Sequence, residues 1–306
     1  MDYELAIIGA GPAGYSAGIY AVRSGITTAL FDRGDGGGRA VLSPNIENYA
    51  GFESISGTEL MEKMKHHASK YVTMHLYEEV KTIKPMENLF ALQTSKGNYK
   101  VGAILLSTGT EHKTLDIPGE KEFQGKGVSY CATCDGFFFR GKPVAVIGGG
   151  STAVMEALFL KQIGCSEVFL IHRRDQLRAE KIYETEAREK NVQIVLNKEV
   201  EKISGLDVLQ MLHLKDMVTG KLSTLRVNGV FVSVGHIPQN MLAQQLQVAL
   251  DTDGYIVVDR MQRTNIKGVY AAGDITGGVR QVITACAEGA VAALSTTESL
   301  GKKYPY

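Results

Sequence analysis

The chain has 306 residues, and its 33 lysines and arginines balance 33 aspartates and glutamates, so the formal net charge is zero. Hydrophobic residues make up 44% and charged residues 22%, which is ordinary for globular proteins and excludes a largely disordered chain. The balanced charge argues against a protein built mainly to bind nucleic acid. The length suggests about two domains.

The uncharged stretch over residues 5–22 does not have the pattern of a membrane span or a secretory leader. It contains four glycines and a proline, and acidic rather than basic residues precede it. The four cysteines form one close pair and two single residues, unlike the disulfide framework of a secreted protein. We therefore expect a soluble, cytoplasmic protein without a membrane partner.

A strand, a glycine turn, a helix and a second strand follow one another at the start of the chain. Residues 4–8 form a short apolar run, Gly9-Ala-Gly-Pro-Ala-Gly14 follows, residues 15–24 have a helical pattern, and the apolar run 27–31 ends in Asp32. This order is typical of a βαβ unit in a parallel sheet, whose glycines let the backbone approach a pyrophosphate at the helix N-terminus. Asp32 is placed to accept hydrogen bonds from ribose hydroxyls.

The same pattern occurs again in the middle of the chain. The apolar run 143–147 precedes Gly148-Gly-Gly-Ser-Thr-Ala153, a helical stretch extends to about residue 163, and the run 167–171 ends in His172-Arg173-Arg174, with Arg178 four residues on. Guanidinium groups bind phosphate through paired hydrogen bonds, so these arginines favour NADP(H) over NAD(H). The alternative is that they are a solvated helix start. The two copies together predict an α/β protein with two Rossmann-like, three-layer dinucleotide-binding domains.

Two further apolar runs end in residues suited to a cofactor. Residues 103–107 lead into Thr108-Gly109, and residues 268–272 lead into Gly273-Asp274. Ligands collect at the carboxyl ends of parallel strands, so Asp274 is a candidate hydrogen-bond partner for a cofactor's ribose or polyol. Alternatively, Asp274 caps the helix that is expected to begin near Gln281.

The motif Cys131-Ala-Thr-Cys134-Asp135 lies between the two halves of the chain. A structural zinc site needs four ligands, and the sequence has no second CxxC and no HxxxH, so no metal site is predicted. A redox dithiol is the better interpretation, in which one thiolate attacks a disulfide and the other resolves it. Asp135 is placed to exchange protons with these thiols. Cys165 and Cys286 are expected to be small buried hydrophobes.

In its motifs and their order, the whole chain resembles the low-molecular-weight, NADPH-dependent thioredoxin reductases. The matching elements are Gly9–Tyr15, Gly37-Gly38, Glu47–Gly51, Cys131–Gly136, His172–Arg178, Gly235–Pro238, Gly273-Asp274 and Arg280-Gln281. The resemblance implies an FAD-binding domain made of residues 1–110 and 239–306, with an NADPH-binding domain, residues 114–234, inserted into it. It implies linkers near residues 109–113 and 234–238 and a homodimer with one FAD per chain.

The resemblance also implies a role for each residue of the redox motif. Cys134 would exchange electrons with the flavin, Cys131 would attack the thioredoxin disulfide, and Asp135 would be the acid/base. Electrons would pass from NADPH through FAD and the dithiol to thioredoxin. Two alternatives remain open: an NADPH-dependent flavin reductase that serves another carrier, such as a glutaredoxin-like protein or a peroxidase, and a non-catalytic NADP(H) sensor.

The sequence departs from the family at two predicted contacts. Gly37-Gly38-Arg39-Ala40 stands where Gly-Gly-Gln-Leu is usual, which would place a cation near the flavin, and Ser151 replaces a common Asn or Asp but is still expected to cap its helix. The predicted FAD-binding residues are Gly9, Gly11, Pro12, Ala13, Gly14, Asp32, Gly37, Gly38, Arg39, Asn48, Thr108, Gly109, Gly273, Asp274, Arg280, Gln281 and Val282. The predicted NADPH-binding residues are Gly148, Gly150, Ser151, Thr152, Ala153, His172, Arg173, Arg174 and Arg178.

Overall fold

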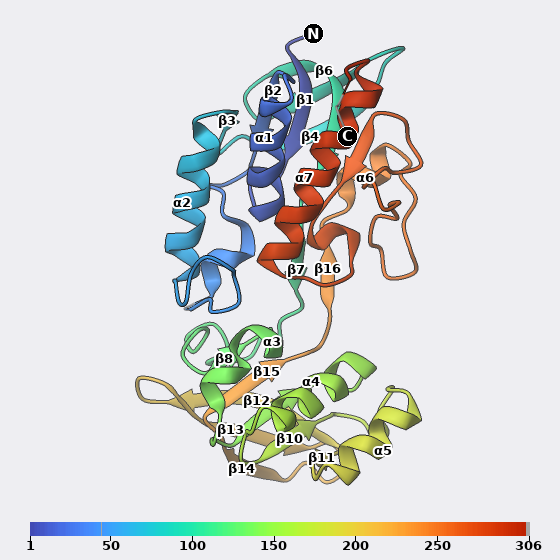
Figure 1. The fold of residues 1–306 in the computed structure, drawn as a ribbon. Helices are drawn as coiled ribbons and strands as arrows, with labels where there is room; N and C mark the ends of the chain where they lie inside the picture. Colours follow the sequence, from blue (N-terminus) through green and yellow to red (C-terminus); the bar gives the residue numbers. More distant parts are fainter. Residues whose placement is uncertain (44, 304–306) are drawn as a thin grey trace. The chain divides into compact units, whose positions relative to one another are not determined.

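The structure, a computed structural model, describes residues 1–43 and 45–303 and contains two compact units (Figure 1). Unit 1 consists of residues 1–111 and 237–306, and unit 2 of residues 112–236. The chain crosses between the units in β7 (Thr110–His112) and β16 (His236–Pro238), which pair with each other. Both crossings fall within the stretches expected to be linkers. The last three residues of the predicted FAD segment, 304–306, lie outside the described residues.

Unit 1 is built on a mostly parallel sheet of seven strands. The parallel part has the order β3-β2-β1-β6-β17, and β4 and β5 continue the sheet from β6 as an antiparallel pair. These strands are β1 (Tyr3–Ile8), β2 (Thr28–Phe31), β3 (Thr73–His75), β4 (Val80–Pro85), β5 (Phe90–Thr94), β6 (Asn98–Leu106) and β17 (Val269–Ala271). The central strands are buried because both faces of the sheet are covered.

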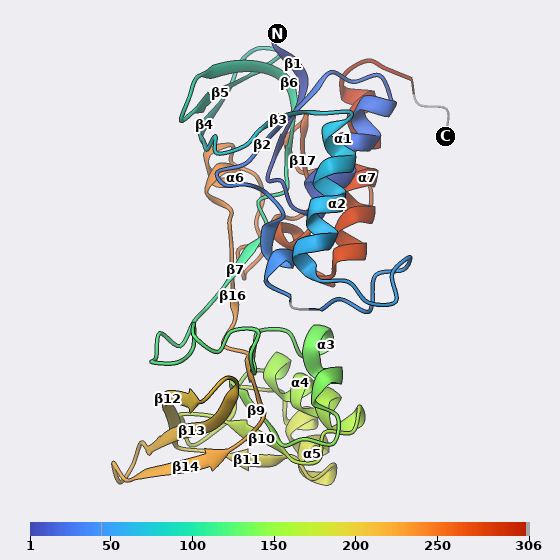
Figure 2. The ribbon, with the colours of Figure 1, turned by 90° about the vertical axis from the view of Figure 1, so that its left-hand side faces the viewer.

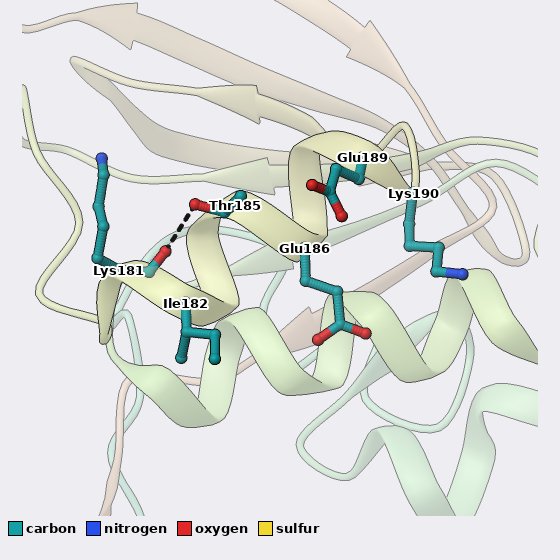
Figure 3. Close-up of a pocket in the computed structure, with 6 residues that line it drawn as sticks. All are labelled: Lys181, Ile182, Thr185, Glu186, Glu189 and Lys190. Atoms are coloured by element: carbon teal, nitrogen blue, oxygen red, sulfur yellow. Dashed lines mark hydrogen bonds between the residues drawn. The ribbon is translucent and has the colours of Figure 1, made fainter.

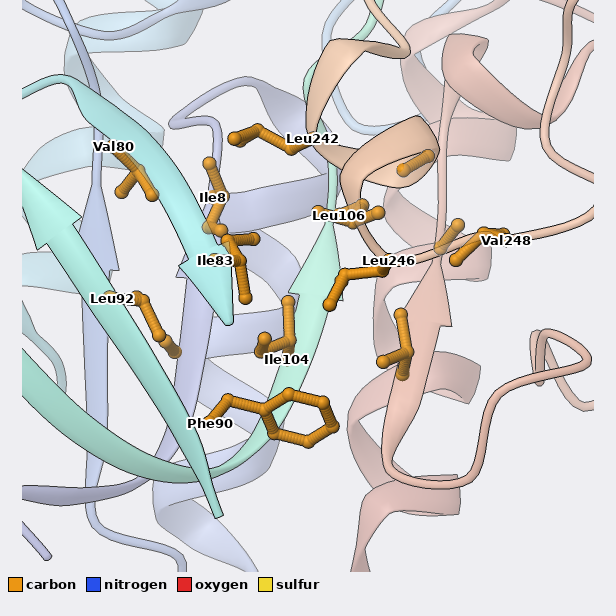
Figure 4. Close-up of a cluster of buried hydrophobic side chains, with 14 of the residues drawn as sticks. Ile8, Val80, Ile83, Phe90, Leu92, Ile104, Leu106, Leu242, Leu246 and Val248 are labelled. Atoms are coloured by element: carbon orange, nitrogen blue, oxygen red, sulfur yellow. The ribbon is translucent and has the colours of Figure 1, made fainter. Parts of the chain in front are cut away.

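Three helices cover one face of this sheet: α1 (Pro12–Arg23), α2 (Gly57–Ser69) and α7 (Val282–Ser299) (Figures 1 and 2). Helices α1 and α7 pack closely, since a side chain at Gly289 would place its Cβ 2.1 Å from the carbonyl oxygen of Ala13. On the opposite face, β4, β5 and α6 (Met241–Gln245) enclose a second core. Figure 4 shows Ile8 and Ile104 from the sheet meeting Leu242 from α6 and Leu246, which follows this helix.

Unit 2 repeats this plan with a five-stranded parallel sheet of order β11-β10-β9-β15-β8 and an antiparallel sheet of three strands. The parallel strands are β8 (Val128–Ser129), β9 (Val144–Ile147), β10 (Val168–Ile171), β11 (Gln193–Val195) and β15 (Gly229–Val232). The antiparallel strands are β12 (Lys198–Gly205), β13 (Leu209–Asp216) and β14 (Leu222–Arg226). The helices are α3 (Ala132–Asp135), α4 (Ser151–Gln162) and α5 (Lys181–Glu189).

The predicted α/β fold with two dinucleotide-type domains is confirmed, and most predicted elements differ from the observed ones by a residue or two. Helix α1 begins at Pro12 rather than Tyr15, because proline is well suited to the first turn of a helix. The largest difference is at β6, which begins at Asn98 rather than at residue 103, because its first residues pair with the antiparallel strand β5. Among the described helices, none is both long and apolar enough to cross a lipid bilayer.

Candidate functional site

The first glycine turn connects β1 to α1 in unit 1. Gly9 has a φ of +112°, and a Cβ there would lie 2.2 Å from the carbonyl oxygen of Ser107, so only glycine fits. A Cβ on Gly14 would lie 1.9 Å from the carbonyl oxygen of Gly9. Gly11 precedes α1, and no side chain of the described residues caps this helix. Its first N–H groups are therefore available to an anion.

Two loops approach this turn, one that carries Asp32 and one that carries Gly37 and Gly38. Asp32, at the end of β2, accepts hydrogen bonds from the backbone N–H of Ala10 at 2.8 Å and of Gly34 at 2.7 Å. Each carboxylate oxygen keeps a second lone pair for a ribose hydroxyl. Gly37 donates its N–H to the carbonyl of Ala10, and a Cβ on Gly38 would lie 3.3 Å from the Cα of Gly11. Gly37 and Gly38 both have a positive φ, and a Cβ on Gly37 would lie 2.6 Å from Val41 Cγ1, so this segment favours glycine.

Arg39 and Asp274 lie together in unit 1. Arg39 donates a hydrogen bond to Thr110 Oγ1 at 2.9 Å, and its Nη1 is 4.0 Å from Asp274 Oδ2. Burial lowers the pKa of Arg39. Burial also raises the pKa of Asp274, an effect that the charges of Arg39 and Arg280 oppose. The capping alternative for Asp274 is wrong, because Asp274 begins the short 3₁₀ helix η3 (Asp274–Thr276) and the N-cap of α7 is Gln281.

Glu288 is a residue of this site that the sequence analysis missed. Its Oε2 accepts a hydrogen bond from the N–H of Gly273 at 2.7 Å and lies 3.3 Å from Thr276 Oγ1. A Cβ on Gly273, whose φ is +81°, would lie 3.0 Å from the Cβ of Ala13. Helix α7 therefore holds the Asp274 segment against the first glycine turn. A lone acid within the apolar stretch 282–295 was the signal for it.

The other predicted FAD residues occupy the edges of the same region. Asn48 Nδ2 donates a hydrogen bond to Gln281 Oε1 at 3.0 Å, which brings two distant segments together. Thr108 and Gly109 follow β6, and a Cβ on Gly9 would be 3.1 Å from the backbone nitrogen of Thr108. The Thr108 hydroxyl donates to the carbonyl of Gln239. Val282 is the first residue of α7.

The second glycine turn joins β9 to α4 in unit 2. A Cβ on Gly148 would lie 2.4 Å from the carbonyl oxygen of Ser233 and 2.6 Å from the Cβ of Ala153. At Gly150, by contrast, a Cβ would meet no described atom within 4 Å, so the space before α4 is open. Thr152 lies in the first turn of this helix.

The predicted cap by Ser151 is wrong. Gly150 is the N-cap of α4, and no side chain in the described part of the chain caps the helix. Ser151 Oγ instead accepts a hydrogen bond from the N–H of Glu180 at 3.2 Å, because Ser151 already lies inside the helix. The orphan N–H groups at the start of α4 are left to a ligand.

The segment from His172 to Arg178 folds back over this turn. The Arg178 N–H donates to the carbonyl of Gly149 at 2.6 Å, and a Cβ on Gly149 would lie 2.2 Å from the His172 ring. Burial, and then the charges of the neighbouring arginines, lower the pKa of His172. Its Nε2 is buried and has no hydrogen-bond partner among the described residues.

The arginine side chains leave this segment toward solvent. Arg173 is about two-thirds exposed, and its Nη1 lies 3.8 Å from Glu199 Oε1. Helix α5 does not begin until Lys181, so the interpretation of these arginines as a helix start is wrong. Their segment is a loop attached to the glycine turn, which is where a 2′-phosphate would require them.

A disulfide joins Cys131 and Cys134, with the Cα atoms 5.3 Å apart. Cys131 is the N-cap of α3, and its Sγ accepts a hydrogen bond from the N–H of Cys134 at 3.2 Å. Gly136 follows the motif and packs under α4, since a Cβ there would lie 2.9 Å from Leu160 Cδ2. The residue after the redox motif thus packs on α4, whose N-terminus adjoins the second glycine turn.

Asp135 is mostly buried beside this disulfide. Its Oδ2 accepts a hydrogen bond from Ser129 Oγ at 2.6 Å, while its Oδ1 is buried without a partner in the described part of the chain. Burial raises the pKa of Asp135, and the Ser129 hydrogen bond opposes that rise. A carboxyl group that keeps its proton closer to neutral pH suits proton exchange with thiols.

The remaining cysteines are free thiols. Cys165 is buried in unit 2 as predicted, and its Sγ belongs to a hydrophobic cluster. The expectation for Cys286 is only partly met, because this α7 residue is half-buried and its Sγ is 3.7 Å from the carbonyl oxygen of Pro12. Burial raises the pKa of Cys286 to about 11, so its thiol stays protonated and unreactive.

A hollow of about 570 Å³ lies along α5, away from these groups (Figure 3). Its lining residues are Lys181, Ile182, Thr185, Glu186, Glu189 and Lys190. None of them is a predicted site residue, and no glycine turn or cysteine borders it. We assign it no part in the site.

The residues present fit two dinucleotides and a redox disulfide. Each glycine turn faces a long helix whose first N–H groups no described side chain caps, and each has polar groups where a ribose or its phosphate would lie. The acid Asp32 suits a free ribose, whereas the basic loop of unit 2 suits a phosphorylated one.

Comparison with known proteins agrees with this arrangement. The family described as "Pyridine nucleotide-disulphide oxidoreductase" matches residues 3–289. Thioredoxin reductase of Treponema pallidum is 42% identical, with 95% of each chain covered, and that of Bacillus subtilis is 38% identical, with 96% and 93% covered. The crystal structure of thioredoxin reductase from Streptococcus pyogenes matches with a TM-score of 0.93 at 36% identity, covering 98% of each chain. The chain therefore belongs to the pyridine nucleotide-disulphide oxidoreductase family, among the thioredoxin reductases, as its sequence motifs predict.

Proposed function

We propose that this enzyme passes electrons from NADPH, through bound FAD and the Cys131–Cys134 disulfide, to oxidised thioredoxin. The observation that carries the proposal is the disulfide itself, which lies next to a buried carboxyl group with one unpartnered oxygen. The curated relatives, which are named for thioredoxin, favour this carrier over a glutaredoxin-like protein or a peroxidase. The same names speak against a non-catalytic sensor.

Unit 1 is the proposed FAD-binding domain. The first glycine turn and the start of α1 would bind the pyrophosphate, and Asp32 would bind the adenosine ribose. Asp274, held by Glu288 through Gly273, would bind the polyol chain. Arg39 and Arg280 would add positive charge beside Asp274.

Unit 2 is the proposed NADPH-binding domain. The turn Gly148–Ala153 and the start of α4 would bind the nicotinamide dinucleotide through its pyrophosphate. Arg173, Arg174 and Arg178 would bind the 2′-phosphate, with His172 as a neutral neighbour because its pKa is lowered.

When bound, FAD would supply hydride acceptance from NADPH and electron delivery to the disulfide. Cys134 is assigned to the exchange with FAD, and Cys131 to the attack on the carrier. The N–H of Cys134 stabilises a thiolate on Cys131, which makes Cys131 the better nucleophile. Opening the disulfide with two electrons and one proton gives a thiol and a thiolate, and Asp135 Oδ1 is the atom proposed to supply that proton.

The transfer to the carrier reverses this step. The Cys131 thiolate attacks the carrier disulfide and forms a mixed disulfide, and Asp135 passes the proton of the Cys134 thiol to the first sulfur that leaves the carrier. The resulting Cys134 thiolate attacks Cys131 and releases the second carrier sulfur, which takes a proton from water. The Cys131–Cys134 disulfide is restored, so the balance is NADPH, a proton and oxidised thioredoxin in, NADP⁺ and reduced thioredoxin out.

We also propose a cytoplasmic homodimer with one FAD per chain. Exposed apolar side chains of unit 1, among them Leu42, Val279 and Ile283, are available for a contact between subunits. Sedimentation velocity on the FAD-loaded protein tests this, with twice the monomer mass as the expected result. A monomer at micromolar concentration would contradict it.

The function is tested by NADPH oxidation in the presence of thioredoxin. We expect turnover that requires both components and is lost in Cys131→Ser and Cys134→Ser, while Cys165→Ser, which removes a buried thiol far from the motif in sequence, retains it. A glutaredoxin-like protein and a peroxidase are offered in parallel as carriers. Turnover with one of these and none with any thioredoxin would contradict the proposal.

A further inference from the structure

Ser129 lies at the C-terminal end of β8, two residues before Cys131. Parallel pairing with Phe231 of β15 fixes its backbone, and the residue is only 6% exposed. A buried hydroxyl in such a place needs hydrogen-bond partners. Among the described residues, its hydrogen-bond partners are Asp135 and the backbone of Cys131, which are parts of the redox motif.

The Ser129 hydroxyl connects the acid to the first cysteine. It donates to Asp135 Oδ2 at 2.6 Å and accepts a hydrogen bond from the N–H of Cys131 at 3.1 Å. The first distance is in the short range expected when the acceptor is charged. The second contact holds the backbone of the residue whose sulfur forms the disulfide.

These contacts divide the two oxygens of Asp135 between different tasks. Oδ2 accepts from Ser129 whether the carboxyl group is ionised or carries its proton on the other oxygen. Oδ1 is buried and has no partner in the described ranges, so it is the oxygen left for the proton. A carboxyl group without this anchor could rotate about its Cβ–Cγ bond and present either oxygen.

We propose that Ser129 is a positioning residue of the redox site, which anchors Asp135 by Oδ2, leaves Oδ1 as its proton-exchanging atom and ties that carboxyl group to the backbone of Cys131. This inference rests on the acid/base role proposed for Asp135. It adds a residue outside the CxxCD motif to the proton-transfer apparatus. Because the hydroxyl donates to the ionised carboxylate, its removal raises the pKa of Asp135 further.

The test compares Ser129→Ala with Ser129→Thr in the full-length, FAD-loaded enzyme. Infrared difference spectra recorded across pH follow the carboxyl band of Asp135, which Asp135→Asn identifies by its loss. We expect the titration to move to higher pH in Ser129→Ala and to remain near that of the wild type in Ser129→Thr, which keeps the hydroxyl. Ser129→Gly, which adds no volume, is the second variant without a hydroxyl and is expected to match Ser129→Ala.

Ser204→Ala is the matched control, because it removes a part-buried hydroxyl of unit 2 that bonds His213 at 2.8 Å on a different sheet. An unchanged titration in both hydroxyl-free variants, or an equal shift in Ser204→Ala, would overturn the proposal. Turnover of Ser129→Ala is expected to fall about tenfold, a part of the roughly 100-fold that acid–base catalysis can contribute, and its pH profile to shift with the titration. The infrared measurement needs no thioredoxin, so a failed assignment of the carrier is distinguishable from a failed role for Ser129.

Discussion

The two glycine turns are built alike but closed differently. In both, a glycine lies against a serine carbonyl at the end of the neighbouring parallel strand: Gly9 against Ser107 and Gly148 against Ser233. In unit 1, Asp32 then folds back onto the turn through backbone hydrogen bonds. In unit 2, an exposed loop that carries Arg173 lies over the turn instead. The closed turn suits a cofactor that stays bound, and the open, cationic one suits a nucleotide that binds and leaves at each turnover.

Alanine substitutions at the turn glycines should change the free energy of unfolding more than any other substitution in these two turns. Gly9→Ala combines a positive φ with a collision against backbone and should lower the free energy of unfolding by about 3 kcal/mol. Gly148→Ala has only the collision and should cost about 2 kcal/mol. Urea unfolding of the apoprotein measures both.

Gly150→Ala is the control for this pair, because open space surrounds that position. It should change stability by less than about 0.5 kcal/mol and still weaken NADPH binding. Equal destabilisation by Gly148→Ala and Gly150→Ala would show that the contact with Ser233 is not what requires glycine.

Removal of Arg173 and Arg174 should have the next largest effect, which is on the affinity for NADPH. Arg173→Ala combined with Arg174→Ala should weaken NADPH binding by about 2 kcal/mol, roughly thirtyfold, and leave NADH binding unchanged. Isothermal titration with each nucleotide measures this. Arg188→Ala, which removes an α5 arginine paired with Glu184, is the control and should bind both nucleotides normally. An equal loss of affinity for NADPH and NADH would show that these arginines do not bind the 2′-phosphate.

The sequence predicts both turns well because each lies between an apolar run and a helix, and these features are local. Other contacts in the two units join residues that lie farther apart in the sequence. Ser129 acts on Asp135 only because α3 turns back toward the end of β8, and Glu288 acts on Gly273 only because α7 packs on α1. The spacing of sequence motifs cannot predict contacts that depend on how helices and strands pack. The Ser151 prediction failed because it placed the helix start one residue too late.

Glu288 gives the closed turn of unit 1 a pH dependence. Burial raises the pKa of Glu288, so the folded apoprotein binds this proton more tightly than the unfolded chain does. The stability of the folded protein therefore falls as pH rises from the pKa of Glu288 in the unfolded chain to its pKa in the folded protein. Glu288→Gln keeps an acceptor for the N–H of Gly273 and removes the charge. We expect the stability of this variant relative to the wild type to improve from about pH 4 to neutral pH.

Thermal unfolding of both apoproteins across pH measures this difference. Glu298→Gln is the control on the same helix, because Glu298 is mostly exposed and pairs with Arg263. A difference that is constant with pH, or one that grows in favour of the wild type, would contradict a buried, proton-binding Glu288.

The smallest effect is expected at Ser151, in the open turn of unit 2. Ser151→Ala removes an acceptor for the N–H of Glu180 at an exposed position, so the cost should be about 0.5 kcal/mol. Urea unfolding beside Ser223→Ala, an exposed serine of β14, provides the comparison. A loss of more than about 1.5 kcal/mol would indicate the capping role that the sequence predicted.

Electrons from the nicotinamide nucleotide must reach the sulfur atoms of Cys131 and Cys134 if this enzyme works as proposed. The decisive experiment adds NADPH to the FAD-loaded enzyme without oxygen, alkylates the thiols and locates the labels by mass spectrometry. We expect NADPH to open the disulfide, so that Cys131 and Cys134 both become labelled, with no such change when NADPH is omitted. A disulfide that remains intact while FAD is reduced would contradict it.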